Sequence, residues 1–301
     1  MKTIIIISIS LVLTINLFAQ NQLPNKDYRL TRDSLSKMST IIWKQKTDSA
    51  KLKANTDFFV FFQSVLTNES FVSQPFDSIY GITRIASDDQ KLQIYTWDVP
   101  LNDATFSYFG FIRTPNLEQK AVPLITKKYE KSDFQNVSLS SENWYGAIYY
   151  RLIQIIIGGK TDYTLLGWDG YNDQLNRKII DILSMDEQGK FTFGQPVFHT
   201  SEGVLNRVVF EYAEEANMLL RYDYQAYKIQ KGRKVRLKNE WMIVADRLVP
   251  MAPNMDDMRK YYVPSGEIYD GFLFRNGQWS LVEDIVVNDK APKRGSPPKN
   301  P

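Results

Sequence analysis

Apolar positions near the start of the chain follow a helical spacing. From Thr31 to Ala54 they recur every three or four residues with lysines between them, which predicts an amphipathic helix. The triplet Asn55-Thr56-Asp57 has side chains that are typical of helix N-caps, so we expect a break there. A second, phenylalanine-rich helix is predicted from Phe58 to Leu66. Residues 20–70 are therefore expected to form an N-terminal helical hairpin that packs its phenylalanines on the rest of the chain.

Between residues 71 and 287 the pattern changes to short alternating runs, which are typical of strands with one buried face. Aromatic side chains make up 13% of the chain and favour such pleated surfaces. Turn residues join the runs in pairs at 87–89, 115–116, 158–159, 187–189, 214–215 and 276–277. The Asn-Gly pair in the last of these turns is the strongest hairpin signal. We predict a mainly β body, an antiparallel hairpin meander (β-sandwich, curled sheet or propeller-like) that forms one globular unit with the helical hairpin.

The two ends of the chain differ from this body. Lys2 followed by an apolar run over residues 4–18 and by Ala19 is typical of a secretory signal, with cleavage expected before Gln20. We therefore expect a signal peptide over residues 1–19 and an exported protein, periplasmic or extracellular. No later run is long and apolar enough to predict a transmembrane helix in the mature chain. The proline-rich, lysine-rich segment 288–301 is expected to be a disordered tail.

Composition narrows the possible chemistry. The chain has no cysteine, which excludes disulfides, thiol catalysis, Cys-ligated zinc and iron–sulfur clusters. It has a single histidine, His199, which excludes a His-rich metal site and leaves one residue through which any catalytic triad would have to pass. We expect neither a cofactor nor a metal. The formal net charge of +3 is carried by the two ends, and the slightly acidic body argues against nucleic acid as a partner.

A basic segment is the most informative local feature. Residues 228–238 contain six basic residues in eleven and no acid, and Val235 and Leu237 alternate with basic positions. This pattern predicts a strand pair that turns at Lys231-Gly232 and has one apolar and one cationic face. The candidate binding residues are Lys231, Arg233, Lys234 and Arg236. An envelope protein or an anionic cell-wall or lipid surface would be the partner. The alternative is a soluble, protruding hairpin whose lysines prevent edge-to-edge pairing of sheets.

Carboxylates beside tryptophans offer a second kind of site. Glycoside hydrolysis needs two facing acids, and sugar rings stack on aromatic side chains. The candidates are Trp97 with Asp98 and Trp168 with Asp169. Further acids near predicted strand ends are Asp246, Asp270, Glu283 and Asp284. The alternative is that these acids are solvated turn residues, or, for the oxygen-rich segment 169–173, that they hold a structural cation.

Several longer stretches carry a resemblance to a family. They include "DDQKLQIYTWDVPL", "NWYGAIYYRL", "YTLLGWDGYN", "RVVFEYAEEANMLLRYD" and "SGEIYDGFLFRNGQWSLVED". In these stretches the chain resembles uncharacterised secreted proteins of Bacteroidetes-type bacteria. The resemblance implies an exported, β-rich protein with no known activity. Ala245 and Arg247 depart from the pattern, which has a Phe-Asp-His-Leu-like segment where this chain has "VADRL".

These observations lead to two expectations for function. The first is an exported, non-enzymatic binding or assembly protein of the cell envelope. The alternative is a carbohydrate-active hydrolase or glycan-binding protein that uses paired carboxylates and aromatic platforms. A deep cleft that holds two close carboxylates above an aromatic floor would favour the alternative. A flat aromatic or basic face would favour the first.

Overall fold

The computed structural model describes residues 26–114, 120–127, 134–231 and 234–287. The predicted signal peptide (1–19), the predicted tail (288–301) and the turn at 115–116 lie outside the described residues. Within the described ranges, no helix combines the length and the apolar character that a membrane crossing requires.

Two helices open the fold, as predicted: α1 spans Lys26–Lys44 and α2 spans Asp48–Thr67. The break between them precedes Asp48, so the break expected at residues 55–57 is wrong. Thr47 is the N-cap of α2, and its hydroxyl accepts a hydrogen bond from the Ala50 amide at 3.3 Å. Asn55 lies inside α2, where its side-chain oxygen accepts a hydrogen bond from the Trp97 indole at 2.7 Å. Because this tertiary partner occupies the Asn55 side chain, it does not compete with the helix backbone for a cap.

The body consists of strands with short connections. The strands are β1 (Thr83–Ala86), β2 (Gln93–Pro100), β3 (Phe106–Arg113), β4 (Ala121–Ile125), β5 (Leu139–Ser140), β6 (Ile148–Ile157), β7 (Lys160–Asp169), β8 (Leu175–Met185), β9 (Phe191–Phe193), β10 (Phe198–Thr200), β11 (Gly203–Leu205), β12 (Val208–Ala213), β13 (Leu220–Lys231), β14 (Lys234–Pro250), β15 (Tyr262–Arg275) and β16 (Gln278–Ile285). Short 3₁₀ helices lie at Glu69–Phe71, Ser141–Asn143, Pro253–Met255 and Arg259–Tyr261. This confirms a mainly β protein with an N-terminal helical hairpin.

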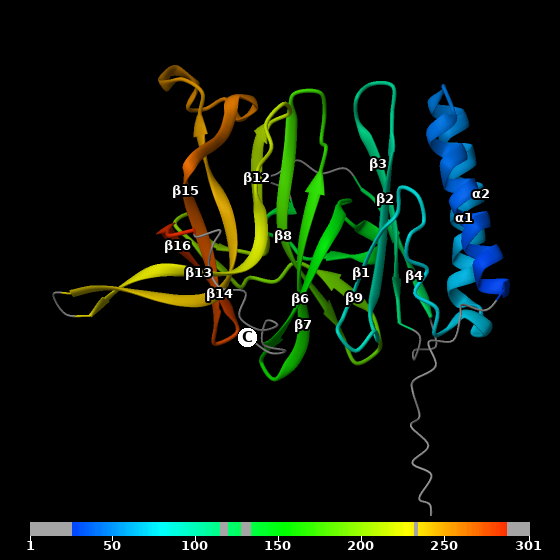
Figure 1. The fold of residues 1–301 in the computed structure, drawn as a ribbon, viewed down its shortest axis with the longest axis horizontal. Coiled ribbons are helices and arrows are strands. Elements are labelled where there is room, and N and C mark those ends of the chain that lie inside the picture. Colours follow the sequence, from blue (N-terminus) through cyan, green and yellow to red (C-terminus); the bar gives the residue numbers. More distant parts are fainter. Residues whose placement is uncertain (1–25, 115–119, 128–133, 232–233, 288–301) are drawn as a thin grey trace, which may run out of the picture.

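The described strands form three sheets, which Figure 1 shows side by side, with the helical layer at the right edge. The first sheet has the order β1-β2-β3-β4, and the helices cover its outer face. The second has the order β5-β9-β8-β7-β6, with β12 pairing to β8. The third has the order β11-β10-β16-β15-β14-β13. Neighbouring strands are antiparallel except β10 and β16, which are parallel. The architecture is therefore a stack of sheets.

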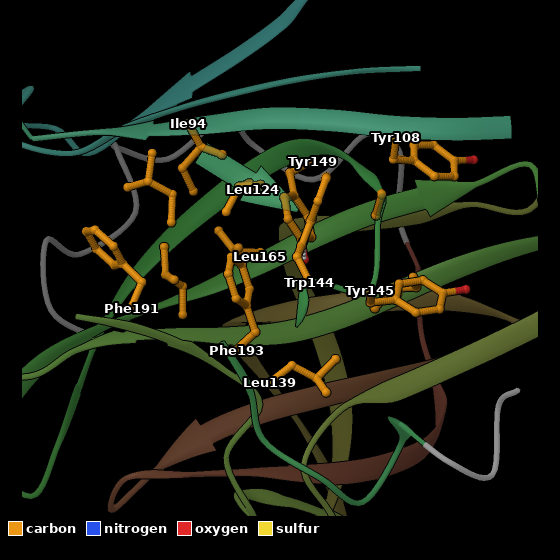
Figure 2. Close-up of a cluster of buried hydrophobic side chains, with 14 of the residues drawn as sticks. Ile94, Tyr108, Leu124, Leu139, Trp144, Tyr145, Tyr149, Leu165, Phe191 and Phe193 are labelled. Atoms are coloured by element: carbon orange, nitrogen blue, oxygen red, sulfur yellow. Dashed lines mark hydrogen bonds between the residues drawn. The ribbon is translucent and has the colours of Figure 1, made fainter. Parts of the chain in front are cut away.

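Apolar clusters fill the spaces between these layers. The first lies between the helices and the first sheet and contains Phe58, Phe62 and Trp97. The next joins the first and second sheets through residues such as Ile94 and Leu165 (Figure 2). A third cluster joins the second and third sheets. The third sheet is also curled, because the Val286 amide donates a hydrogen bond to the Ala226 carbonyl at 2.9 Å and so brings the chain after β16 against β13.

Most of the predicted hairpins are confirmed, including β15–β16, where Asn276 and Gly277 both have positive φ angles of 52° and 78°. The hairpin expected around 214–215 is wrong. β12 pairs with β8 in the second sheet, whereas β13 pairs with β14 in the third, so this connection crosses between sheets. The alternation of each strand was correct, but alternation does not select the pairing partner.

The bond between Asn55 and Trp97 gives a testable prediction. Asn55→Ala leaves the indole N–H of Trp97, which is 1% exposed, without its acceptor. We expect the free energy of unfolding to fall by about 1–2 kcal/mol in urea titrations, because an unsatisfied buried donor outweighs the better helix propensity of alanine. The control is Thr56→Ala, at the next, exposed position of α2, which should change stability by less than about 0.5 kcal/mol. Equal effects of the two substitutions would contradict the prediction.

Candidate functional site

Strand alternation separates the first tryptophan–aspartate pair. Successive residues of β2 point to opposite faces of the sheet, so Trp97 and Asp98 cannot act together on one ligand. Trp97 points to the helices and packs edge-on against Phe58, with ring centroids 5.3 Å apart. It is a core residue and offers no platform for a sugar ring.

Asp169, at the end of β7, is the centre of a buried polar cluster. The Tyr108 hydroxyl from β3 donates a hydrogen bond to its Oδ1 at 2.9 Å, and the Tyr145 hydroxyl donates to its Oδ2. Figure 2 shows the hydroxyl ends of these two tyrosines directed to the same side of the apolar cluster. The Gly170 amide in turn donates to the Tyr108 hydroxyl at 2.8 Å. Since Tyr108 belongs to the first sheet and Asp169 to the second, the cluster joins the two sheets.

Arg177 from β8 supplies the positive charge of this cluster. Its Nη1 lies 4.0 Å from Asp169 Oδ2, and its Nε and Nη2 donate to Glu211 Oε1 at 3.0 and 2.8 Å. The guanidinium also stacks on the Tyr171 ring, 3.5 Å from its centroid. Burial raises the pKa of Asp169, while hydrogen bonds from the tyrosines and the charge of Arg177 act in the opposite direction. The cluster is an internally satisfied cross-link between sheets.

Asp98 lies on the same side of the first sheet as Tyr108, its cross-strand partner. Its carboxyl is half-buried, and burial raises its pKa to about 6. Within the described part of the chain, no cation lies within ion-pair distance of it. The charges of Asp98 and Asp169 both raise the pKa of Tyr108, so the two predicted acids do lie near one tyrosine.

A cavity of about 410 Å³ lies between α2 and the end of β4. Its lining is mainly apolar and contains no acid: Asn55, Thr56, Phe59, Phe106, Ser107, Tyr108, Phe109, Leu124, Ile125 and Thr126. Trp168 packs edge-on against Phe106 at 5.7 Å and is half-buried. The cavity therefore lacks the two carboxylates that the hydrolase alternative needs.

The oxygen-rich segment 169–173 is a turn. The Asn172 side-chain oxygen accepts hydrogen bonds from the Gln174 and Leu175 amides, both at 2.9 Å, as an Asx turn does. Both oxygens of Asp169 are already bonded to tyrosine hydroxyls. These bonds occupy the side-chain oxygens of Asp169 and Asn172 within the protein.

The basic segment forms the end of the β13–β14 hairpin, which projects away from the body in Figure 1. Lys231 and Lys234 form its last backbone pair, while Arg233 and the side chain of Lys231 lie outside the described residues. Lys234 and Arg236 are exposed, as predicted. The exposed fractions of Val235 and Leu237 are 67% and 60%, which places two aliphatic side chains in solvent beside the cations.

The two faces of this hairpin are mixed, which corrects the prediction of one apolar and one cationic face. Cross-strand partners share a face of the sheet. Lys228 is opposite Leu237, and Ile229 is opposite Arg236, so each face carries apolar and basic side chains. The alternation of β14 places Val235 and Leu237 on one face and Lys234 and Arg236 on the other, as predicted, but β13 adds Lys228 to the first face and Ile229 to the second.

The base of the hairpin is fixed by a small network around Glu240. Its carboxylate pairs with Lys238 and Arg275, and the Tyr227 hydroxyl donates to it at 3.2 Å. Lys238 is therefore paired with a carboxylate, which it shares with Arg275. Lys228, Lys234 and Arg236 have no carboxylate within 4.0 Å among the described residues. The uncompensated charge of the hairpin lies near its end.

Arg247 pairs with Asp270 and lies 2.8 Å from Asp284 Oδ1. Sequence reasoning missed the buried arginines Arg177 and Arg207 and the tyrosines that accompany Asp169. A charge inside an otherwise apolar strand, as in "RKIIDIL", was the available signal for a buried polar network. No protein-family model matches the chain, and no curated protein or solved structure matches it either.

Proposed function

We propose that the protein is an exported, non-enzymatic binding protein of the cell envelope and that the β13–β14 hairpin contacts an anionic lipid surface. The observation that carries the proposal is the projecting end of the hairpin, where exposed Val235 and Leu237 lie among the uncompensated Lys228, Lys234 and Arg236. The signal-like N-terminus supports the exported location.

The shape and chemistry of the hairpin suit a bilayer interface. Aliphatic side chains at a projecting end can enter the headgroup region, while long basic side chains extend to the lipid phosphates. Each basic residue near an anionic surface contributes about 1 kcal/mol. Full burial of a valine or leucine contributes about 1.5–3 kcal/mol. Three cations and two aliphatic side chains together are therefore sufficient for reversible peripheral binding.

Vesicle flotation tests this proposal. The protein recovered after export, with a mass that shows the chain to begin at Gln20, is mixed with vesicles of phosphatidylcholine alone or with added phosphatidylglycerol. We expect binding to the anionic vesicles that weakens as salt rises. Reversal of two charges by Lys234→Glu with Arg236→Glu should weaken it at least tenfold, because each reversal replaces an attraction with a repulsion.

The matched control reverses two exposed lysines of the helical layer, Lys37→Glu with Lys46→Glu, which changes the net charge equally at the other side of the molecule. This variant should bind the anionic vesicles nearly as well as the unmodified chain. Val235→Ser with Leu237→Ser separates the apolar contribution and should also reduce binding. If the two charge-reversed variants lose binding equally, or if anionic vesicles bind no better than neutral ones, the hairpin is not a lipid-binding element.

A further inference from the structure

A second cavity, of about 390 Å³, lies at the edge of the first sheet, far from the β13–β14 hairpin of the third sheet. It is lined by residues of the segment after α2 and of the β1–β2 hairpin: Val72, Ser73, Pro75, Arg84, Asp89, Gln90, Lys91 and Gln93. Its volume is within the range of about 300–1,000 Å³ that is usual for sites of small organic ligands.

Arg84, on β1, has unused hydrogen-bonding capacity at this cavity. Its Nη2 donates to Gln90 Oε1 at 2.5 Å, but its Nε is buried and has no hydrogen-bond partner. Among the described residues, no carboxylate lies within 4.0 Å of its guanidinium. A guanidinium has five N–H donors in a fixed geometry, and a buried donor without a partner requires an explanation.

A second guanidinium, that of Arg113, lies behind Gln93. Arg113 is fully buried, and it donates to the carbonyls of Leu66, Phe71 and Gln74 at 3.2, 2.7 and 2.8 Å. All of these acceptors are neutral. Burial lowers the pKa of Arg113, the Tyr95 hydroxyl acts in the opposite direction, and the charge of Arg84 makes a smaller lowering contribution. The Tyr95 hydroxyl interacts with both guanidiniums, and among the described residues no carboxylate lies within 4.0 Å of either.

The other charged groups in this region form ion pairs of their own. Lys91 Nζ lies 3.2 Å from Asp89 Oδ2, so these two rim charges balance each other. Arg32 Nη2 lies 3.0 Å from Asp33 Oδ1, so these two charges also balance each other. Among the described residues, Arg84 is therefore the cationic lining residue that has no carboxylate partner.

The backbone around the cavity is held in unusual conformations. Phe76, Ser78 and Gln90 have positive φ angles of 46°, 61° and 58°, in the left-handed region that favours glycine. Gln90 lines the cavity, and Phe76 follows the lining residue Pro75. Such conformations are costly and gather at ligand-binding sites more often than elsewhere.

We propose that this cavity binds a phosphate monoester. The phosphate pairs with the guanidinium of Arg84, because an arginine fork matches phosphate oxygens and no carboxylate among the described residues occupies it. Gln90 Nε2 donates one hydrogen bond, to the Ser87 carbonyl, and keeps a second N–H for a hydroxyl group of the organic part, while Val72 and Pro75 line the cavity for apolar contact. This site is independent of the proposed lipid-binding hairpin.

Isothermal titration calorimetry with the exported chain tests the proposal, using glucose 6-phosphate, glucose, inorganic phosphate and citrate at equal ionic strength. We expect one glucose 6-phosphate per chain, weaker binding of inorganic phosphate and none of glucose. Arg84→Gln should weaken glucose 6-phosphate binding at least tenfold. The control Arg151→Gln removes an exposed arginine of β6 and should leave binding unchanged. Arg84→Lys keeps the positive charge but lacks the forked guanidinium, so it should bind glucose 6-phosphate with intermediate strength. It replaces Arg84→Gln as the test variant if Arg84→Gln does not fold.

Three outcomes would overturn the proposal. The first is no binding of glucose 6-phosphate, or binding that Arg84→Gln does not weaken. The second is inorganic phosphate bound as tightly as the ester, which would indicate an adventitious ion only. The third is binding of citrate without the ester, which would replace the phosphate assignment with a carboxylate one.

Discussion

Arg207→Leu is expected to lower the free energy of unfolding by about 3–5 kcal/mol at pH 7, the largest effect of any substitution considered for this protein. Arg207 and Asp181 are fully buried, and Arg207 Nε lies 3.2 Å from Asp181 Oδ2. The other guanidinium nitrogens donate to the carbonyls of Val137 at 2.9 Å, Phe193 at 3.0 Å and Phe134. Removing the arginine leaves a buried carboxylate and three carbonyls without this donor.

The loss should depend on pH. Burial raises the pKa of Asp181, and Arg207 opposes this effect. Without Arg207 the carboxyl takes up a proton more readily in the folded state, so the variant should lose stability as pH rises from 5 to 7. Urea titrations at pH 5 and at pH 7 measure the free energy of unfolding of the variant and of the unmodified chain. The free energy of unfolding of Arg207→Lys should lie between those of the unmodified chain and Arg207→Leu. Arg151→Leu, at an exposed position, is the control and should change stability by less than about 0.5 kcal/mol. A similarly small effect of Arg207→Leu would contradict the buried pairing.

Asp98→Asn is expected to stabilise the protein by up to about 3 kcal/mol above pH 7. The folded-state pKa of Asp98 is about 6, against 3.8 for an unperturbed aspartate, and each pKa unit corresponds to about 1.4 kcal/mol. Because burial raises this pKa, the folded protein binds the proton more tightly than the unfolded chain does. The stability of the unmodified chain should therefore fall as pH rises from about 3.8 through 6.

The asparagine variant lacks this titration. Its advantage should be small near pH 4, grow through pH 6 and level off above pH 7, as measured by chemical denaturation across that range. Asp88→Asn, in the exposed turn between β1 and β2, is the matched control and should show little change at any pH. An advantage of Asp98→Asn that does not vary with pH would show that its cause is packing and not ionisation.

Local patterns predicted a large part of the fold because strand alternation and turn chemistry depend on near neighbours. The β15–β16 hairpin is an example, since Asn276-Gly277 alone favours the backbone that the turn requires. The predicted break at Asn55 failed for the opposite reason. The hydrogen bond from Trp97, 42 residues away, occupies the side chain that would otherwise cap a helix.

Among the candidate sites too, those made of contiguous residues were predictable and those that depend on the packing of distant segments were not. The basic hairpin was predictable because its residues are contiguous, although the pairing of Leu237 with Lys228 changed the composition of its faces. The neighbourhood of Asp98 and Asp169 was not predictable, because it depends on how the first sheet packs on the second. The cavity at Arg84 combines residues of the β1–β2 hairpin with the segment that follows α2, and no short motif marks it.

By itself, the sequence determined the helical hairpin, most of the strand pairs, the absence of cysteine chemistry and the location of the basic segment. These properties follow from composition and from periodicities of two and 3.6 residues. Only the tertiary structure decided which sheet each strand joins and which charges are buried. The partners of Arg207 lie 14 to 73 residues away along the chain, and those of Arg113 lie up to 47 residues away. Such contacts depend on the packing of whole layers, which no local pattern specifies.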